Sequence, residues 1–305
     1  MIALTKIREL DISPADAGIG PLHLSAASGL VCLDSIICVI ADDELHLGVF
    51  SLINGKPGHL IRLFDGVLPQ AKAARKRQKP DLEALARLPA FRNFPHGALL
   101  AFGSGSRPNR RRGVLLGLGP DVEMLMPPRT VDLSPILVPL NEEFSEVNIE
   151  GAVVVGDELR LFQRGNKSQA DNAIIRFPLS TVLDALQAGS VEAIKPSSIR
   201  RLDLGVLHGV PFSFTDAAVL SNGDMVFSAV AEDTEDAFRD GPCIGAAIGI
   251  ADNNGNLRSV RRLERPHKIE GIHARSDGSR LDLLLVTDAD NPEIPSVLFS
   301  TTMEI

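Results

Sequence analysis

Short apolar segments recur along the whole chain and are separated by residues that favour turns. Examples are SGLVCLDSIICVIA, GALLAFG, GAVVVG and LDLLLV, and glycine, aspartate, asparagine or proline stands near the ends of such segments. Many short strands with frequent turn signals are typical of a β-sandwich, barrel or propeller. Tight hairpin turns are predicted at Asn222-Gly223, Asn254-Gly255, Gly156-Asp157 and Asp277-Gly278. The pattern therefore predicts an all-β protein built from sequential hairpins.

One stretch near residue 180 shows clear helix signals. Ser180 is suited to cap a helix, and Val182, Leu183 and Leu186 follow it as an apolar stripe. Gly189 is suited to end the helix. We expect one short helix here, within a chain that otherwise forms strands.

An internal repeat determines the architecture that we predict. The segments D-L-E-A-L, N-I-E-G-A and K-I-E-G-I share a polar–apolar–Glu–small–apolar motif, and A-S-G-L and T-D-A-A fit it with a changed acidic position. The aligned positions are Ser28, Glu83, Glu150, Asp216 and Glu270. Repeats of this length predict the blades of a propeller, with the motif on the innermost strand of each blade.

The repeat predicts a single five-bladed β-propeller domain spanning residues 1–305. It assigns PDLEALARLP to a strand, although this segment has helical propensity, because tertiary context overrides so weak a preference. We expect the N-terminal strand ALTKIREL to pair with residues 297–301 and complete the last blade, which protects the sheet edges. Six blades and a sandwich stay open as alternatives.

Composition and charge exclude several classes of function. The net charge is −8, which disfavours binding to nucleic acid or to an anionic membrane. Tryptophan and tyrosine are absent, which weighs against aromatic sugar subsites and single-stranded nucleic-acid grooves. We expect a cytoplasmic protein, since the N-terminus lacks a signal-peptide pattern and no apolar run reaches about 18 residues. Cys32, Cys38 and Cys243 have no metal-ligand spacing and are predicted to be free thiols.

Candidate metal ligands follow from the repeat. Innermost strands run beside the channel of a propeller, so Glu83, Glu150, Asp216 and Glu270 should form a ring around it. Carboxylates this close cannot all stay ionised unless a cation balances them. Hard oxygen ligands suit Ca²⁺ or Mg²⁺, and we predict such a cofactor here.

The strand ends that follow the motifs supply a second tier of polar groups: Asp42 and Asp43; Ser104, Ser106 and Arg107; Arg164 and Asn166; Glu232 and Asp233; Asp288 and Asp290. The predicted ligand-binding residues are Ser28, Ser104, Arg107, Arg164 and Asn166. The basic runs 72–79 and 107–112 are interpreted as solvated loops, unless Arg107 or Arg110 turns toward the channel and binds an anion. The alternative for the ring is structural: the glutamates pair with Arg107, Arg164 or backbone N–H groups and hold the blades together.

The motifs also carry a family resemblance. The series S-G-L, D-x-E-A-L, G-S-G-S-R, N-I-E-G, L-R-L-F-Q-R-G-N, F-T-D-A, K-I-E-G and V-T-D-A-D spans nearly the whole chain and resembles the phytase-like (esterase-like) propeller superfamily, with its uncharacterised bacterial members. The resemblance implies a propeller with a ligand or metal site at its central channel. For some relatives it also implies esterase-like or phosphatase activity.

The function expected from the sequence is binding of a small polar or anionic ligand at an acidic, cation-occupied channel. As an enzyme, the protein would catalyse metal-assisted hydrolysis of a phosphoester or ester, with Glu150 or Glu270 as the catalytic base. One alternative is a non-catalytic scaffold that binds a protein partner and uses the carboxylate ring structurally. Another is a glycoside hydrolase with paired carboxylates. No nucleic-acid or membrane partner is expected.

Overall fold

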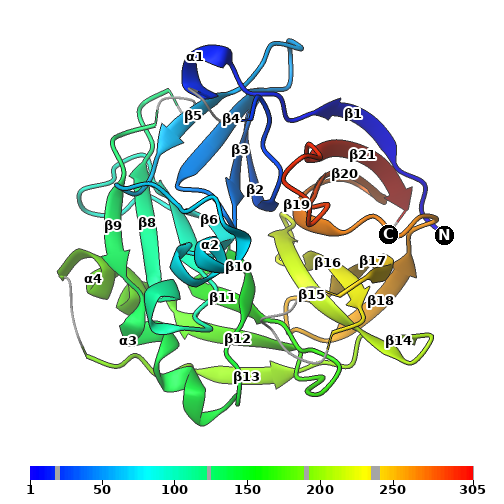
Figure 1. Cartoon of the computed structure of the whole chain (residues 1–305). Coiled ribbons are helices and arrows are strands. Elements are labelled where there is room, and N and C mark those ends of the chain that lie inside the picture. The colour runs from blue at the N-terminus through cyan, green and yellow to red at the C-terminus, as the bar shows by residue number, and fades with distance from the viewer. Residues whose placement is uncertain (18–20, 122–124, 189–191, 235–240, 305) are drawn as a thin grey trace.

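The computed structural model of the protein describes residues 1–17, 21–121, 125–188, 192–234 and 241–304. Five antiparallel sheets stand around a central channel, and Figure 1 looks along this channel. The first blade consists of β2 (Ala27–Leu33), β3 (Ile36–Ala41), β4 (His46–Ser51) and β5 (His59–Arg62). The second consists of β6 (Leu82–Leu88), β7 (Ala98–Gly103), β8 (Arg112–Gly117) and β9 (Arg129–Asp132).

The other three blades continue around the ring. The third contains β10 (Ile149–Val155), β11 (Glu158–Gln163), β12 (Ala173–Pro178) and β13 (Ser198–Arg201). The fourth contains β14 (Val206–Leu207), β15 (Val210–Val219), β16 (Met225–Glu232), β17 (Cys243–Ala251) and β18 (Leu257–Arg262). The fifth contains β19 (Ile269–Asp277), β20 (Arg280–Thr287), β21 (Val297–Glu304) and β1 (Thr5–Glu9).

The two ends of the chain close the ring. Strand β1 pairs antiparallel with β21, with Thr5 opposite Ser300 and Glu9 opposite Val297. Figure 1 shows the two termini side by side at this blade. The predicted five-bladed propeller and its closure by the N-terminal strand are confirmed, and the predicted strand in PDLEALARLP is β6.

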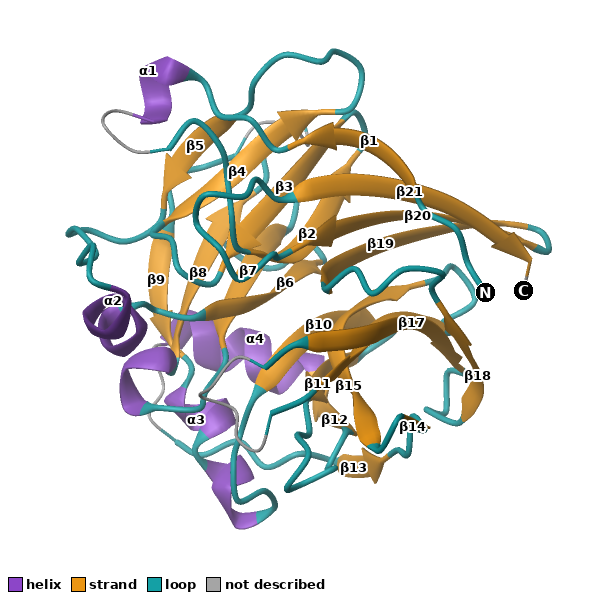
Figure 2. Ribbon diagram, turned by 45° about the vertical axis from the view of Figure 1, so that its right-hand side comes forward, coloured by secondary structure: helices purple, strands orange, loops and turns teal. Residues whose placement is uncertain are grey.

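The helices lie outside the blades, as Figure 2 shows. They are α1 (Pro14–Ala17), α2 (Lys72–Gln78), α3 (Ser134–Leu137), α4 (Leu179–Ala188) and the 3₁₀ turns Pro108–Arg110 and Pro139–Glu142. The predicted helix is α4, which begins at Leu179, so Ser180 lies in its first turn rather than before it; Gly189 lies outside the described residues. The basic run 72–79 was expected to be a loop, but most of it forms α2. None of the described helices has the length and apolar character that crossing a membrane requires.

Apolar packing is divided among the five interfaces between neighbouring blades. Each of the five buried clusters takes its residues mainly from two adjacent blades. Between the third and fourth blades, for example, Phe214 packs edge-to-face against both Phe162 and Phe227. Since the core sits between the sheets, the channel is left to polar side chains.

Each innermost strand carries a β-bulge at the repeated motif. The register skips one residue in β2, β6, β10, β15 and β19, namely Ser28, Glu83, Glu150, Thr215 and Glu270. A bulge leaves the extra residue out of the hydrogen-bond ladder and re-aims its side chain. The sequence alignment placed Asp216 at the position that Thr215 occupies. Asp216 instead corresponds to the small residue that follows the bulge in the other blades.

Close approach of the innermost strands explains why a small residue follows the bulge. A Cβ atom at Gly151 would lie 3.1 Å from the backbone nitrogen of Ala217, in the next blade. A substitution there would therefore press on backbone rather than on a flexible side chain. The Glu-Gly pair thus brings neighbouring blades close together and turns a carboxylate toward the channel.

Candidate functional site

In three of the five blades, the bulge residue and the residue two positions before it face the same polar channel. Alternate residues of a strand share a face, so each of these three innermost strands presents two side chains there. Asp81 precedes Glu83, Asn148 precedes Glu150 and Lys268 precedes Glu270, and all six line the channel. The spacing is visible in the sequence, yet Asp81 and Lys268 were not predicted to be site residues.

The channel is narrow and carries an excess of acidic groups. Its lining contains eight carboxylates, from Asp42, Asp81, Glu83, Glu150, Glu232, Glu270, Asp288 and Asp290. It contains five basic side chains, from Lys76, Lys79, Arg110, Arg164 and Lys268. The cavity has a volume of about 80 Å³, enough for a few water molecules or a small ligand. The charges do not balance within the lining unless protons or a bound cation compensate.

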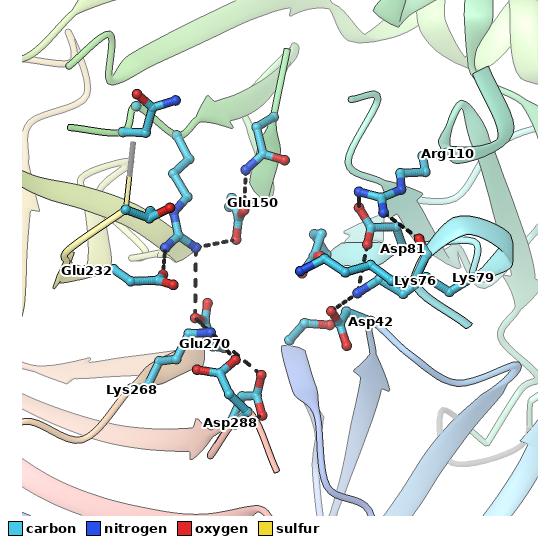
Figure 3. Close-up of a pocket in the computed structure, with 18 residues that line it drawn as sticks. Asp42, Lys76, Lys79, Asp81, Arg110, Glu150, Glu232, Lys268, Glu270 and Asp288 are labelled. Carbon is cyan, nitrogen blue, oxygen red and sulfur yellow. Dashed lines mark hydrogen bonds and ion pairs between the residues drawn. The ribbon is translucent and has the colours of Figure 1, made fainter. Parts of the chain in front are cut away.

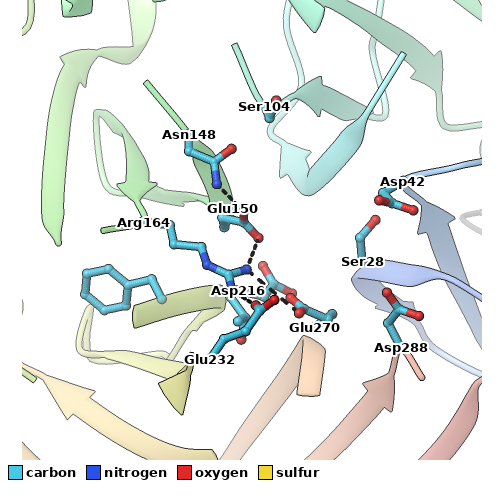
Figure 4. A network of polar contacts seen from close by, with 12 residues as sticks. Ser28, Asp42, Ser104, Asn148, Glu150, Arg164, Asp216, Glu232, Glu270 and Asp288 are labelled. Atoms are coloured by element: carbon cyan, nitrogen blue, oxygen red, sulfur yellow. Dashed lines mark hydrogen bonds and ion pairs between the residues drawn. The ribbon is translucent and has the colours of Figure 1, made fainter. Parts of the chain in front are cut away.

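Arg164 is the centre of one cluster of charges, seen in Figure 4. Its guanidinium group donates to a carboxylate oxygen of Glu232, lies 3.3 Å from Oε2 of Glu150 and lies 3.9 Å from Oε1 of Glu270. The amide nitrogen of Asn148 donates to the other oxygen of Glu150 at 2.6 Å. All these side chains are largely buried, so Arg164 joins the third, fourth and fifth blades beside the channel.

Burial favours the neutral form of each group in this cluster, and the oppositely charged neighbours favour the ionised form, so the two effects shift each pKa in opposite directions. Burial lowers the pKa of the Arg164 guanidinium, but Glu150, Glu232 and Glu270 more than offset this, and the net pKa lies above its usual value. Burial raises the pKa of Glu150 and of Glu270, although Arg164 and Lys268 work against the increase. One arginine therefore stabilises the ionised form of its glutamate neighbours only in part.

Asp81 is the centre of a second cluster on the opposite side of the channel, shown in Figure 3. Its carboxylate lies 2.9 Å from the Lys79 ammonium and 2.7 Å from Nη1 of Arg110, and it accepts a hydrogen bond from Ser104 Oγ at 2.6 Å. Lys79 also donates to Asp42. Among the described residues, Asp42, Asp81 and Glu83 each offer one carboxylate oxygen within 4.8 Å of the others, close enough to share a metal ion.

Two carboxylates in the channel have no hydrogen-bond partner among the described residues. Glu270 is only 4% exposed, and neither of its oxygens accepts a hydrogen bond; the nearest cation is Lys268, whose Nζ lies 3.5 Å from Oε1. Glu83 forms no hydrogen bond or ion pair within that part of the chain. Burial and then the neighbouring Glu150 raise the pKa of Glu83. These two groups are available to bind a cation or a hydrogen-bond donor.

The predicted site residues divide into those in the channel and those near it. Glu83, Glu150, Glu270, Ser28, Arg164 and Asn166 line the channel. Ser28 donates to the backbone oxygen of Leu82 and thereby links the first two blades. Ser104 lies behind Asp81, and Arg107 does not line the channel, whereas Arg110 does.

Asp216 is buried near the channel but does not line it. Its Oδ2 accepts a hydrogen bond from the backbone N–H of Ile272 at 2.9 Å, and its Oδ1 has no hydrogen-bond partner among the described residues. No described lysine or arginine forms an ion pair with it. Burial raises the pKa of Asp216 well above its usual value, although backbone hydrogen bonds act in the opposite direction.

Asp216 should make the stability of the protein depend on pH. Because the pKa of Asp216 is raised in the folded state, its protonated side chain contributes to the free energy of unfolding. This contribution is fully present below the unfolded pKa of about 3.9 and is lost as pH rises through the folded pKa. Each unit of the shift corresponds to about 1.4 kcal/mol. We expect Asp216→Asn to be more stable than the wild type at pH 8 and to lose less stability between pH 5 and pH 8. Urea unfolding at both values measures this, and an unchanged pH slope would contradict it.

Comparison with solved structures finds proteins of diverse function. The chain is 10% identical to an α-L-arabinofuranosidase from Podospora anserina, with a TM-score of 0.53 over 99% of this chain and 97% of the other. A glutaminyl cyclase from Myxococcus xanthus is 12% identical, with a TM-score of 0.48 and coverage of 100% and 98%. Hydrazine synthase from Kuenenia stuttgartiensis is 9% identical, with a TM-score of 0.43; the match covers 92% of this chain and 63% of that one, less than two thirds of its length. Identities this low show similarity of fold alone.

The expected relation to phytase-like propellers is confirmed only as far as the five-bladed propeller fold. No curated protein matches the chain. A family model described as "Family of unknown function (DUF6929)" matches residues 23–303, nearly the whole sequence. The chain therefore belongs to this family, and its described structure is that of a five-bladed β-propeller with an acidic channel.

Proposed function

We propose that the channel binds a divalent cation, Ca²⁺ or Mg²⁺, and through it a small polar or anionic ligand. The observation that carries this proposal is the excess of carboxylates, eight against five basic side chains, around a space of about 80 Å³. Like charges buried at short range raise one another's pKa values unless a cation compensates. A divalent cation would neutralise most of the excess in a single step.

The donor groups fit a hard cation. Asp42, Asp81 and Glu83 supply carboxylate oxygens close to one another, and Ca²⁺ and Mg²⁺ both prefer oxygen ligands. Glu270, buried and without a hydrogen-bond partner among the residues that the structure describes, lines the same channel. The small volume favours an ion with a few waters over an oligosaccharide, which argues against the glycoside hydrolase alternative.

Hydrolysis of a phosphoester or ester is the finer part of the proposal. The cation would supply Lewis-acid chemistry at the bond to be broken. Glu270 is the better of the two predicted bases, because its oxygens accept no hydrogen bond from the described residues, while Glu150 accepts hydrogen bonds from Asn148 and Arg164. A carboxylate whose pKa is raised by burial is suited to accept a proton from an attacking water near neutral pH.

Thermal unfolding of the EDTA-treated protein, with Ca²⁺ or Mg²⁺ added back, tests the proposal through Glu83→Gln. A cation at 100 times its Kd should stabilise the wild type by about 2.7 kcal/mol. We expect Glu83→Gln to respond much less. Without a cation, the same variant should be more stable than the wild type, because it removes a carboxylate that forms no ion pair within the described part of the chain and whose pKa is raised by burial.

Glu293→Gln is the matched control, since it removes the same charge from an exposed loop residue. It should respond to the cation as the wild type does. A wild type that no cation stabilises would refute the proposal, and equal responses in Glu83→Gln and the wild type would place the ion elsewhere. Cation-dependent turnover of a phosphate ester that Glu270→Gln abolishes would extend the proposal from binding to catalysis.

One observation favours the structural alternative, in which the ring only holds the blades of an interaction scaffold together. Arg164 contacts Glu150, Glu232 and Glu270, which come from three blades. If this alternative holds, charge-neutral substitution of Glu150 and Glu270 should lower stability and leave cation affinity unchanged. Glu83, which makes no such contact, distinguishes the two functions.

A further inference from the structure

Helix α2 lies over one end of the channel, in front of the innermost strands in Figure 1. It belongs to the connection between the first and second blades, which runs from the buried Phe64 to the buried Leu82. No residue of α2 is buried, so the helix contributes nothing to the five apolar clusters. Lys76 from α2 and Lys79 just after it nevertheless line the channel.

Polar contacts attach α2 to both neighbouring blades. Arg75 donates to the backbone oxygen of Asp43 at 2.6 Å and to Oε1 of Glu44 at 2.9 Å, in the first blade. Arg110, in the second blade, donates to the backbone oxygen of Lys76 at 2.9 Å. An element held by charged and polar contacts, without buried apolar side chains, belongs to the part of a fold that opens at low free-energy cost.

Lys79 is the deepest of these contacts. It is 7% exposed, and its ammonium donates to Asp42 and lies 2.9 Å from Asp81, two of the three carboxylates in the candidate metal group. Burial lowers the pKa of Lys79, but the charges of Asp42 and Asp81 raise it by more. The net pKa lies well above its usual value, so the amine stays charged. A single positive charge of the chain itself thus sits against the oxygens that a metal ion would need.

We propose that Lys79 is an internal cation that occupies the Asp42–Asp81–Glu83 group, and that a divalent cation binds by displacing it and releasing α2 from the channel. This inference rests on the proposed function and adds its regulation. Displacement is favourable because a divalent ion balances more of the carboxylate excess than one ammonium does. It also opens the end of the channel that α2 covers, which couples cation binding to access for a second ligand.

The coupling is reciprocal. If binding of the cation weakens the attachment of α2, weakening that attachment must strengthen cation binding by the same factor. Lys79→Met removes the competing ammonium and keeps a side chain of similar length. Arg75→Gln removes the contacts of α2 with Asp43 and Glu44 and leaves all three carboxylates and Lys79 in place.

Calorimetric titration of the EDTA-treated full chain with Ca²⁺ and with Mg²⁺ is the first measurement. We expect the Kd of Lys79→Met to be at least about tenfold lower than that of the wild type, within the range typical of coupled sites. Arg75→Gln should shift the Kd in the same direction by a smaller factor. Lys56→Met, which removes one charge from an exposed loop, should bind as the wild type does.

Limited digestion with trypsin is the second measurement, because Lys72, Arg75, Lys76 and Arg77 are potential cleavage sites within α2. Mg²⁺ should speed cleavage of this segment in the wild type by several-fold and leave cleavage after Arg92, in an exposed turn, unchanged. In Lys79→Met the segment should be cleaved rapidly with or without Mg²⁺. A purely electrostatic effect of the substitution would alter affinity and leave cleavage of the wild type insensitive to the ion.

The outcomes separate the two proposals. Tighter binding by Lys79→Met than by the wild type, together with cation-accelerated cleavage of the wild type, supports displacement. Binding by Lys79→Met alone would mean that the lysine excludes the ion, and it overturns displacement. Equal affinities in the two proteins, or protection of α2 by the cation, overturn displacement and leave the cation site standing if Glu83→Gln abolishes binding. Absence of binding in both proteins overturns both proposals.

Discussion

Arg164→Met should destabilise the protein by about 3–5 kcal/mol, the usual cost of removing one partner from a buried ion pair. The guanidinium is the cation shared by Glu150, Glu232 and Glu270, each of which has a side chain no more than 6% exposed. Methionine keeps much of the apolar stem and removes the charge and its donors. The loss of stability therefore comes mainly from leaving the three carboxylates without their shared cation. Urea unfolding at pH 7.5 measures this loss.

Two comparisons identify the cause of that loss. Arg92→Met removes an arginine that lies 3.7 Å from Asp184 on the surface, with side chains 73% and 69% exposed, and should cost less than about 1 kcal/mol. Lower pH should reduce the difference in unfolding free energy between the wild type and Arg164→Met, because the carboxylates that have lost their cation then take up protons. A loss of stability below about 1 kcal/mol, or a loss that is the same at pH 5 and pH 8, would show that Arg164 is not the principal counter-charge of the three carboxylates.

The architecture could be predicted because one device is repeated five times. Each innermost strand has a bulge followed by a small or short residue, and in four of the five blades the bulge residue lines the channel. This combination leaves a visible motif such as Glu150-Gly151. Strands of this kind override local preference, which is why β6 forms from a segment of helical propensity. The fourth blade was misaligned by one residue, because Asp216 resembles the acidic bulge residues while Thr215 occupies their place.

The chemistry of the site was harder to predict, because four of its five basic groups come from outside the repeat. Lys79 and Arg110 lie in connections of the second blade, and Arg164 follows the end of β11. No spacing along the chain indicates that Arg164 reaches Glu232, which is 68 residues away. The innermost strands thus determine where the carboxylates gather, and long-range folding of the connections determines which of them acquire a partner.

Asp81→Ala should be the second strongly destabilising change, with an expected cost of about 3–5 kcal/mol from the broken ion pairs. Asp81 accepts a hydrogen bond from Ser104 and contacts Lys79 and Arg110, which are 7% and 3% exposed. It also has a φ of +57°, a left-handed conformation that aspartate tolerates better than alanine does.

Asp34→Ala is the matched control, because Asp34 has a φ of +48° in an exposed turn and shares the backbone cost without the ion pairs. It should lose only about 1–2 kcal/mol, measured by urea unfolding beside Asp81→Ala. Asp81→Asn, which keeps a side chain suited to this backbone but lacks the charge, should fall between them. If Asp81→Ala loses no more than Asp34→Ala, backbone strain alone explains the effect. A clear excess would mean that Asp81 supplies the negative charge that keeps both Lys79 and Arg110 at the channel, so any cation that displaces Lys79 must leave the pair with Arg110 intact.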